Sequence, residues 1–158
     1  MKILVTGAGG FVGSHVLASL QSDAHQILAM RRSDKHGAGE DVSGQIRWVY
    51  GDLADFQLLA PAIRAFNPDV LIHLAWQGIP DYGEAMSILN FNLSLQLFNF
   101  VLDETRCRKV IVSGSCLEYG REIGLCKESA PTRGTSYFSW GKHALSDYLS
   151  FKCRKTGV

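Results

Sequence analysis

The chain has 158 residues, of which 46% are hydrophobic and 20% are charged, with a net charge of +1 at pH 7. This length is enough for one domain with a real core, and the composition is that of a globular rather than a disordered chain. The charge balance gives no reason to expect a nucleic acid or an anionic membrane surface as a partner.

No apolar stretch reaches the roughly 18 residues of a membrane helix, and the N-terminal apolar run lacks a signal-peptide cleavage pattern. The four cysteines lie far apart and show no metal-like spacing with each other or with histidines. We therefore expect a cytoplasmic protein with reduced thiols and no metal site. The cysteines are Cys107, Cys116, Cys126 and Cys153.

Short β-branched runs alternate along the chain with longer segments of helical periodicity. They predict strands over 2–6, 26–30, 46–50, 70–74 and 110–113, and helices over 11–20, 56–66, 85–102 and 140–151. This alternation, with apolar strands, predicts an α/β fold in which a parallel sheet is covered on both faces, a doubly wound sheet or Rossmann fold. Residues 33–45, with three glycines and mixed charge, predict a loop.

A glycine-rich turn, Thr6-Gly7-Ala8-Gly9-Gly10-Phe11-Val12-Gly13, joins the first predicted strand to the first helix. Glycines at 7, 10 and 13 permit a tight turn, close approach of the backbone to a pyrophosphate and close helix–strand packing. The helix N-terminus offers free N–H groups and the positive end of its dipole to the anion. Glycines also make ordinary turns, but this position between strand and helix predicts a dinucleotide site.

The tip of the second predicted strand bears on the choice of cofactor. An NAD site carries Asp or Glu there, about twenty residues past the glycine loop, to bind the ribose hydroxyls. This chain has Met30-Arg31-Arg32 instead. A guanidinium pairs with a 2′-phosphate and has no acceptor for the hydroxyls. The alternative is a pair of solvated arginines at a strand end. The pattern favours NADP over NAD.

In this order and over the whole chain, these segments resemble the extended short-chain dehydrogenase/reductase family, the sugar-nucleotide epimerases and dehydratases. Five motifs carry the resemblance. They are the glycine loop, Gly51-Asp52-Leu53 (the adenine-contacting acid), His73-Leu74-Ala75 (an H-x-A stretch lining the cofactor), Asn92 with its helix (an N-V-x-G segment), and Ser113 to Gly120 (an S-S-x-x-x-Y-G segment).

The resemblance implies a set of cofactor-binding residues. Two of its members keep an alternative, because Asp52 could simply cap the next helix and His73 could be a satisfied buried histidine. The implied set is Gly7, Gly10, Phe11, Val12, Gly13, Arg31, Asp52, Leu53, Leu74, Ala75, Asn92 and Lys142.

The resemblance also implies hydride transfer at a carbon of a nucleotide sugar or another small carbonyl compound, with Ser115, Tyr137 and Lys142 as catalytic residues. A phenol has a pKa near 10, and a neighbouring ammonium lowers that pKa toward the working range. Lys142 would also hold the nicotinamide ribose, and Ser115 would hydrogen-bond the reacting oxygen. Tyr119 is expected to pack or to contact substrate.

The spacing of this pair is one residue too long. To share one helix face, the tyrosine must lie four residues before the lysine, and the residue at that spacing is Phe138. Five apart in a regular helix, Tyr137 and Lys142 diverge by ~140°. Tyr137 could precede the helix, a π-bulge could restore the phase, or the pair could be non-functional. The flanking Pro131-Thr132 and Gly141-Lys142 favour accommodation.

Two classes of function therefore stay open: an NAD(P)-dependent oxidoreductase, epimerase or dehydratase, and a catalytically incompetent dinucleotide-binding or regulatory module. The chain ends at Thr156-Gly157-Val158, where a sixth strand would begin. We expect one NAD(P)-binding domain over 1–158, truncated after the fifth strand and its following helix, without a C-terminal substrate-binding part. Two copies could pair at the open fifth strand or along adjacent helices as a homodimer.

Overall fold

The computed structural model of the protein describes residues 1–32, 44–120 and 127–156. The chain forms two compact units. The first comprises Met1–Ala75 and Leu97–Val112, and the second comprises Trp76–Gln96 and Ser113–Val158. Most of the predicted loop over 33–45 lies outside the described residues, and so does Cys126.

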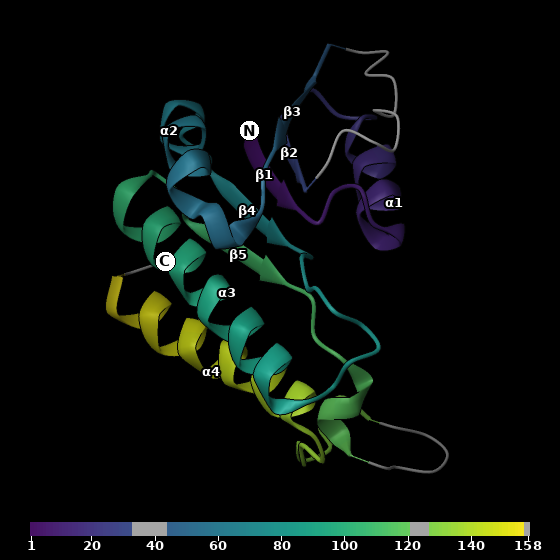
Figure 1. Ribbon diagram of the computed structural model, residues 1–158. Coiled ribbons are helices and arrows are strands. Elements are labelled where there is room, and N and C mark those ends of the chain that lie inside the picture. Colours follow the sequence, from purple (N-terminus) through teal and green to yellow (C-terminus); the bar gives the residue numbers. More distant parts are fainter. Residues whose placement is uncertain (33–43, 121–126, 157–158) are drawn as a thin grey trace. The chain divides into compact units, whose positions relative to one another are not determined.

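The first unit is built on a parallel sheet of five strands in the order β3-β2-β1-β4-β5 (Figure 1). In the centre of the sheet, Leu4 lies in register with Leu28 on one side and Leu71 on the other, and all three are fully buried. The predicted doubly wound parallel sheet is confirmed, and β5 is an edge strand of the described sheet. The strands are β1 (Lys2–Thr6), β2 (Gln26–Arg31), β3 (Ile46–Tyr50), β4 (Val70–His73) and β5 (Lys109–Val112).

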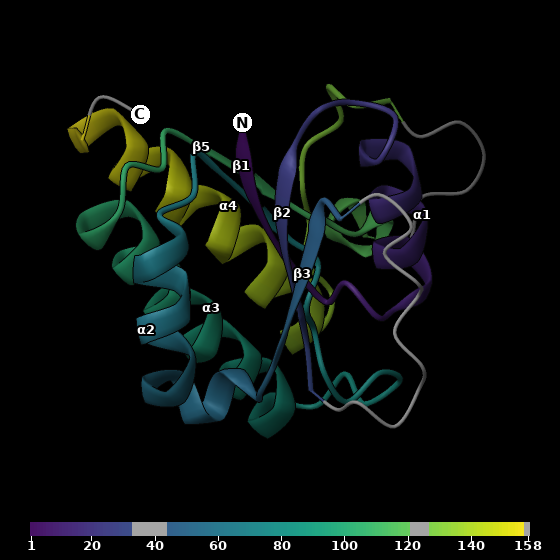
Figure 2. The same ribbon diagram turned by 90° about the horizontal axis from the view of Figure 1, so that it is seen from above.

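Helices α1 (Phe11–Leu20) and α2 (Phe56–Phe66) lie on opposite faces of this sheet (Figure 2). Successive side chains of a strand point to opposite faces. Ile3 and Val5 accordingly join Leu17 of α1 in one buried cluster, while Leu4 belongs to the other face. Both faces of the sheet are therefore apolar, as the continuous hydrophobic strands predict.

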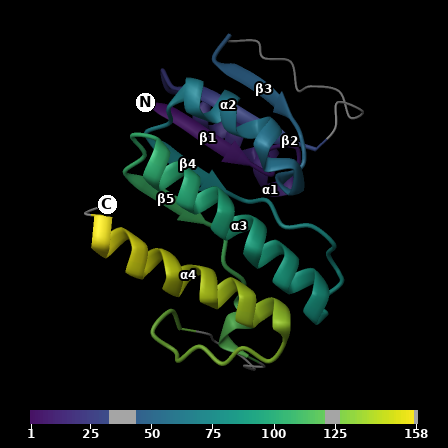
Figure 3. The same ribbon diagram turned by 60° about the vertical axis from the view of Figure 1, so that its left-hand side comes forward.

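Helix α3 (Glu84–Glu104) contributes its C-terminal half to the first unit and its N-terminal half to the second. The C-terminal half lies beside α2 (Figure 3), where the rings of Phe56 and Phe100 meet edge to face at 5.1 Å. Helix α3 is the one described helix long and apolar enough to cross a membrane. Phe98 and Val101 of this half are fully buried, as the side chains of a core helix are.

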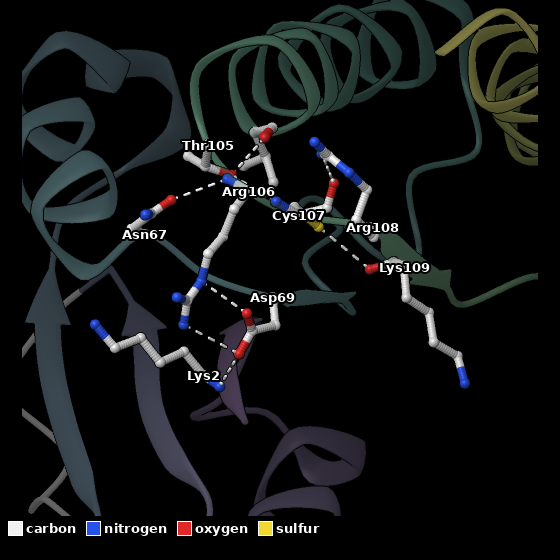
Figure 4. A network of polar contacts seen from close by, with 9 residues as sticks. Lys2, Asn67, Asp69, Thr105, Arg106, Cys107, Arg108 and Lys109 are labelled. Atoms are coloured by element: carbon white, nitrogen blue, oxygen red, sulfur yellow. Dashed lines mark hydrogen bonds and ion pairs between the residues drawn. The ribbon is translucent and has the colours of Figure 1, made fainter. Parts of the chain in front are cut away.

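A polar network ties together the N-terminal ends of β1 and β4 and the turn before β5 (Figure 4). The Asp69 carboxylate accepts a hydrogen bond from the Lys2 backbone N–H at 2.7 Å and pairs with Arg106 Nε at 2.7 Å. The Arg106 backbone N–H donates to Asn67 Oδ1 at 2.9 Å. Asn67 itself ends α2 in the left-handed conformation, with φ of 52°. The network fixes the strands at the edge opposite their carboxyl ends.

The second unit contains the N-terminal half of α3, the short 3-10 helix η2 (Cys116–Tyr119) and α4 (Tyr137–Thr156). Helix α4 begins three residues before the predicted start at 140. Ser136 caps it, because its hydroxyl accepts the Ser139 N–H at 3.2 Å and its own N–H donates to the Ser139 hydroxyl at 3.1 Å. The rings of Phe91 in α3 and Trp140 in α4 meet at 5.6 Å.

Candidate functional site

The loop between β1 and α1 is built around two glycines that no other residue could replace without movement. Gly7 has φ of +68°, and a Cβ there would lie 2.7 Å from the Ala75 backbone nitrogen. A Cβ on Gly13 would overlap the Gly7 carbonyl oxygen and would lie 2.7 Å from Ala8 Cα. The loop is therefore closed tightly upon itself and upon the end of β4.

The N-terminus of α1 is open. Gly10 is the N-cap, with extended backbone and no side-chain cap. The Ser14 N–H bonds to the Gly10 carbonyl at 2.9 Å, so the N–H groups of Phe11, Val12 and Gly13 precede the hydrogen-bond ladder of the helix. Phe11 and Val12 are exposed. Such an arrangement suits an anion such as a pyrophosphate, and the residues present fit the phosphates of a dinucleotide.

Arg31, the last residue of β2, is held beside the glycine loop by two aromatic rings of β3. Its guanidinium carbon lies 4.8 Å from the ring of Trp48 and 5.1 Å from that of Tyr50. A Cβ on Gly9 would lie 3.2 Å from Arg31 Cδ, so the arginine stem runs against the loop. Neither ring was among the predicted site residues. The parallel register, which pairs Arg31 with Tyr50, carries the signal.

The remaining predicted residues of the first unit lie at the ends of β3 and β4. Asp52 Oδ1 accepts the Ala54 N–H at 2.9 Å and so caps the 3-10 helix η1 (Leu53–Asp55), of which the half-buried Leu53 is the first residue. His73 is buried and shares a 2.7 Å hydrogen bond with the Thr6 hydroxyl. Both structural alternatives, cap and satisfied histidine, are therefore present in the fold.

Leu74 and Ala75 come directly after β4 and lie against the glycine loop. The Leu74 N–H donates to the Thr6 carbonyl at 3.2 Å, and the Ala75 N–H donates to the Thr6 hydroxyl at 3.4 Å. Their backbone atoms are those that a Cβ on Gly7 would meet. The structure therefore brings this pair of predicted residues to the loop.

In the second unit, Lys142 is held in a cradle of Ser113 and Trp76. Only 6% of the lysine is exposed. Its Nζ donates to the Ser113 carbonyl at 3.0 Å and to the Ser113 hydroxyl at 3.3 Å, and lies 4.3 Å from the centre of the Trp76 ring. Burial lowers the pKa of Lys142 from 10.5 to about 8, and the Glu118 carboxylate opposes this shift. The amine therefore titrates in an accessible pH range.

No hydrogen bond joins the predicted Ser115 to Lys142 among the described residues. Its hydroxyl accepts the Leu117 N–H at 3.2 Å, and its own N–H donates to Glu118 Oε1 at 2.6 Å, which makes a capping box at the start of η2. Sequence reasoning missed the roles of Ser113 and Glu118. The S-x-x-E spacing of Ser115 and Glu118 was a readable signal for the cap.

Tyr137 and Lys142 are not brought together. Residues 137–156 are α-helical throughout, so no π-bulge restores the phase, and Tyr137 is the first helical residue. Phe138 is in phase with Lys142 instead, and its ring meets that of Trp76 at 5.4 Å and that of Tyr82 at 5.0 Å. Tyr137 is 50% exposed, and no hydrogen bond joins it to Lys142 among the described residues.

Tyr137 lines a hollow of about 660 Å³ in the second unit. The hollow is open to solvent on one side and is bounded by the beginnings of α3 and α4. Aromatic and aliphatic side chains make most of its wall, and Glu84 is the one carboxylate among the described residues that line it. The residues that line it are Tyr82, Glu84, Ile88, Gly134, Thr135, Ser136, Tyr137 and Trp140.

The predicted Asn92 is exposed in the middle of α3, whereas Asn90 is buried and fully hydrogen-bonded. Asn90 Oδ1 accepts the Gln77 N–H at 2.8 Å, and its Nδ2 donates to the Gln77 carbonyl at 3.0 Å and to the Met86 carbonyl at 2.8 Å. Sequence reasoning therefore missed Asn90. Periodicity could have found it, since Asn90 and Ser94 lie one turn apart on the buried side of the helix.

Residues 3–157 match the sequence profile of a family described as the NAD dependent epimerase/dehydratase family. The chain is 26% identical over 149 residues to a UDP-glucose 4-epimerase of Halalkalibacterium halodurans, an alignment that covers 92% of this chain and 44% of that protein. It is 31% identical to a UDP-glucose 4-epimerase of Neisseria meningitidis serogroup B, covering 94% of this chain and 47% of that protein. The chain thus spans about half the length of these relatives.

The chain also matches about half the length of solved structures. The UDP-glucose 4-epimerase of Thermotoga maritima, solved with UDP-glucose, is 22% identical with a TM-score of 0.82, covering 100% of this chain and 53% of that chain. The UDP-glucose 4-epimerase of Thermus thermophilus, solved in complex with NAD, is 26% identical with a TM-score of 0.79 and covers 100% and 52%. The first of these shows likeness of fold.

Proposed function

Because the chain belongs to the NAD dependent epimerase/dehydratase family, we propose that it binds a nicotinamide dinucleotide through the loop between β1 and α1. The observation that carries this proposal is the glycine geometry. Gly7 and Gly13 leave no room for a Cβ, and the first N–H groups of α1 have no side-chain cap. The loop thus leaves the helix N-terminus free for the phosphates.

We further propose that the cofactor is NADP rather than NAD. Arg31 supports this preference, because Trp48 and Tyr50 hold its guanidinium beside the loop, and a 2′-phosphate is the part of NADP that a guanidinium recognises. Asp52 and Leu53, which follow β3, and Leu74 and Ala75, which follow β4, are proposed to complete the cofactor site.

Parallel titrations of the chain with NADP and NAD test both proposals. Arg31→Ala is expected to weaken NADP binding by roughly 10- to 100-fold, since a hydrogen bond to a charged group contributes about 1.5–3 kcal/mol, and to leave NAD binding unchanged. Arg32→Ala, at the neighbouring exposed arginine, is the matched control. Binding of neither dinucleotide contradicts the loop proposal. Equal binding of both by wild type and Arg31→Ala contradicts only the NADP preference.

For the chemistry, we propose hydride transfer on a nucleotide sugar, the class of compound that the names of the relatives contain. A bound nicotinamide supplies the hydride acceptor or donor. Lys142 would hold the ribose, while Ser115 would donate to the reacting oxygen. Tyr137 would carry the proton.

A binding module without turnover is the second candidate function. The position of Phe138 supports it. This residue lies four positions before Lys142, on the same face of α4, and its ring contacts that of Trp76, but its side chain has no proton to transfer. A module of this kind would bind dinucleotide and leave substrate unchanged.

An assay that measures the consumption of NADPH in the presence of a nucleotide-sugar ketone distinguishes the enzyme from the binding module. Loss of turnover by about 100-fold or more in Tyr137→Phe, the scale of general acid–base catalysis, supports Tyr137 as the proton carrier. A wild type without turnover that gains it in Phe138→Tyr supports the binding module. Turnover that Tyr137→Phe leaves intact contradicts both candidates and assigns the proton to another group.

A further inference from the structure

The Lys142 cradle depends on the segment that follows β4. Trp76 supplies the ring over the ammonium at 4.3 Å, and the same ring meets Phe138 at 5.4 Å. A Cβ on Gly141 would lie 3.4 Å from Trp76 Cη2, so the indole packs closely on the turn of α4 that carries the lysine. Trp76 therefore has little freedom on the side of α4.

Asn90 holds the backbone next to this ring. Its amide bonds to both the N–H and the carbonyl of Gln77, at 2.8 and 3.0 Å, much as a neighbouring strand would. A third bond, to the Met86 carbonyl at 2.8 Å, anchors the amide to its own helix. Asn90 is 5% exposed, so these bonds do not compete with bulk water.

Close packing supports the same clamp. A Cβ on Gly78 would lie 2.6 Å from Met86 Sδ, so the backbone after Gln77 runs directly against α3. Trp76 thus packs on α4, while the backbone at positions 77 and 78 is held against the N-terminal half of α3. Figure 3 shows these two helices side by side in the second unit.

We propose that Asn90 is a positioning residue that clamps the backbone at Gln77, and thereby holds the Trp76 ring over Lys142 and limits the access of water to the amine. For its relevance to catalysis the inference rests on the proposed function. The clamp itself requires no dinucleotide, so a test on the cofactor-free chain separates its failure from a failure of cofactor binding.

Among the residues that the structure describes, one charged group acts directly on the lysine. Glu118 of η2 is the carboxylate whose charge acts on Lys142. His143, its neighbour on α4, lies 3.8 Å from Glu118 and 3.6 Å from Asp147. A change at Asn90 leaves all of these groups in place. A shift in the titration of Lys142 would therefore report the position of Trp76 rather than a change in charge.

The experiment is an NMR titration of the Lys142 Cε signal in lysine-labelled chain without cofactor, with Lys142→Arg to assign the signal. Asn90→Ser is expected to raise the pKa from about 8 by about one unit, because water then reaches the ammonium. Asn92→Ser, at the exposed asparagine of the same helix, is expected to leave the titration unchanged.

A double-mutant cycle tests the route through Trp76. In Trp76→Leu the ring is absent, so Asn90→Ser added to Trp76→Leu is expected to shift the pKa of Lys142 no further. Additive shifts, or an unchanged titration in a folded Asn90→Ser chain, would overturn the proposal.

Should Asn90→Ser fail to fold, hydrogen exchange in the wild type gives the answer. The Gln77 N–H is expected to be protected, since Asn90 accepts it. Exchange at the rate of an open loop amide would overturn the clamp.

Discussion

Gly13 carries a hydrogen atom where any other residue would place a carbon against the Gly7 carbonyl and Ala8. Gly13→Ala is expected to lower the free energy of unfolding by about 1–3 kcal/mol, the usual cost of overpacking. It should also weaken dinucleotide binding at least tenfold, which corresponds to about 1.4 kcal/mol. Urea denaturation and a binding titration measure the two effects.

Gly44→Ala is the control for this change. Gly44 has φ of +65°, and no heavy atom of the described residues lies within 4 Å of the added carbon, so its cost is confined to the backbone, roughly 1 kcal/mol, with binding unaffected. Unchanged binding in Gly13→Ala would contradict the assignment of the loop as the phosphate site.

Lys142 makes stability depend on pH. Its folded pKa of about 8 lies below the ordinary 10.5. Between these values the unfolded chain binds a proton that the folded chain lacks, so the free energy of unfolding rises with pH, by up to about 1.4 kcal/mol per pH unit. Urea denaturation between about pH 7.5 and 9.5 should show this rise in wild type and its loss in Lys142→Met. Equal slopes in both chains would contradict the burial of the charge.

The residues at the site also show what a sequence can and cannot predict. The five-residue spacing of Tyr137 and Lys142 already raised the question whether both side chains lie on one face of the helix. The answer depended on where α4 starts, and a pair of serines, Ser136 and Ser139, sets that start by capping each other. These hydrogen bonds join polar side chains to the backbone three residues away. Hydrophobic periodicity therefore does not predict them.

At the scale of elements, β1, β3, α1 and α2 begin and end where periodicity predicts. Short apolar runs mark the two strands and helical periodicity marks the two helices, and glycine or asparagine follows β1, β3 and α2. The predicted helix over 85–102 is two residues longer at its C-terminal end, at Glu104. The pairing of Arg31 with Trp48 and Tyr50 could not be read from either strand alone, because it follows from the register between strands.

The network at the N-terminal ends of the strands leads to a prediction in acid. The backbone N–H of Lys2, and next Arg106, hold the pKa of Asp69 below its usual 3.8. The ionised carboxylate therefore stabilises the fold above that value, and its contribution is lost as the pH falls through the lowered pKa. Asp69→Asn should lose less stability than wild type on acidification, as measured by thermal unfolding across the acid range.

Asp55→Asn serves as the comparison, because Asp55 is exposed and its side chain makes no cap hydrogen bond. It should follow the wild-type curve. A wild-type acid limb identical to that of Asp69→Asn would show that the network does not couple the strands to pH.

At the scale of the whole molecule, β5 lies at an edge of the described sheet, with Ile111 43% exposed. An apolar edge strand invites pairing, and we expect a homodimer. Sedimentation over a concentration series should show dimer for wild type and a shift toward monomer for Ile111→Lys. Leu58→Lys, at an exposed leucine of α2, should leave the dimer intact. A monomer at every concentration tested would contradict the predicted homodimer.

The contact between the Trp76 indole and Lys142 should be visible in the intrinsic fluorescence of the protein. The indole lies over an amine that changes charge near pH 8, and indole emission responds to a cation on its face. Part of the intrinsic fluorescence should therefore change in intensity with the protonation of Lys142, and this part should vanish in Trp76→Leu. The unlabelled chain thus contains its own optical indicator for the state of its buried lysine.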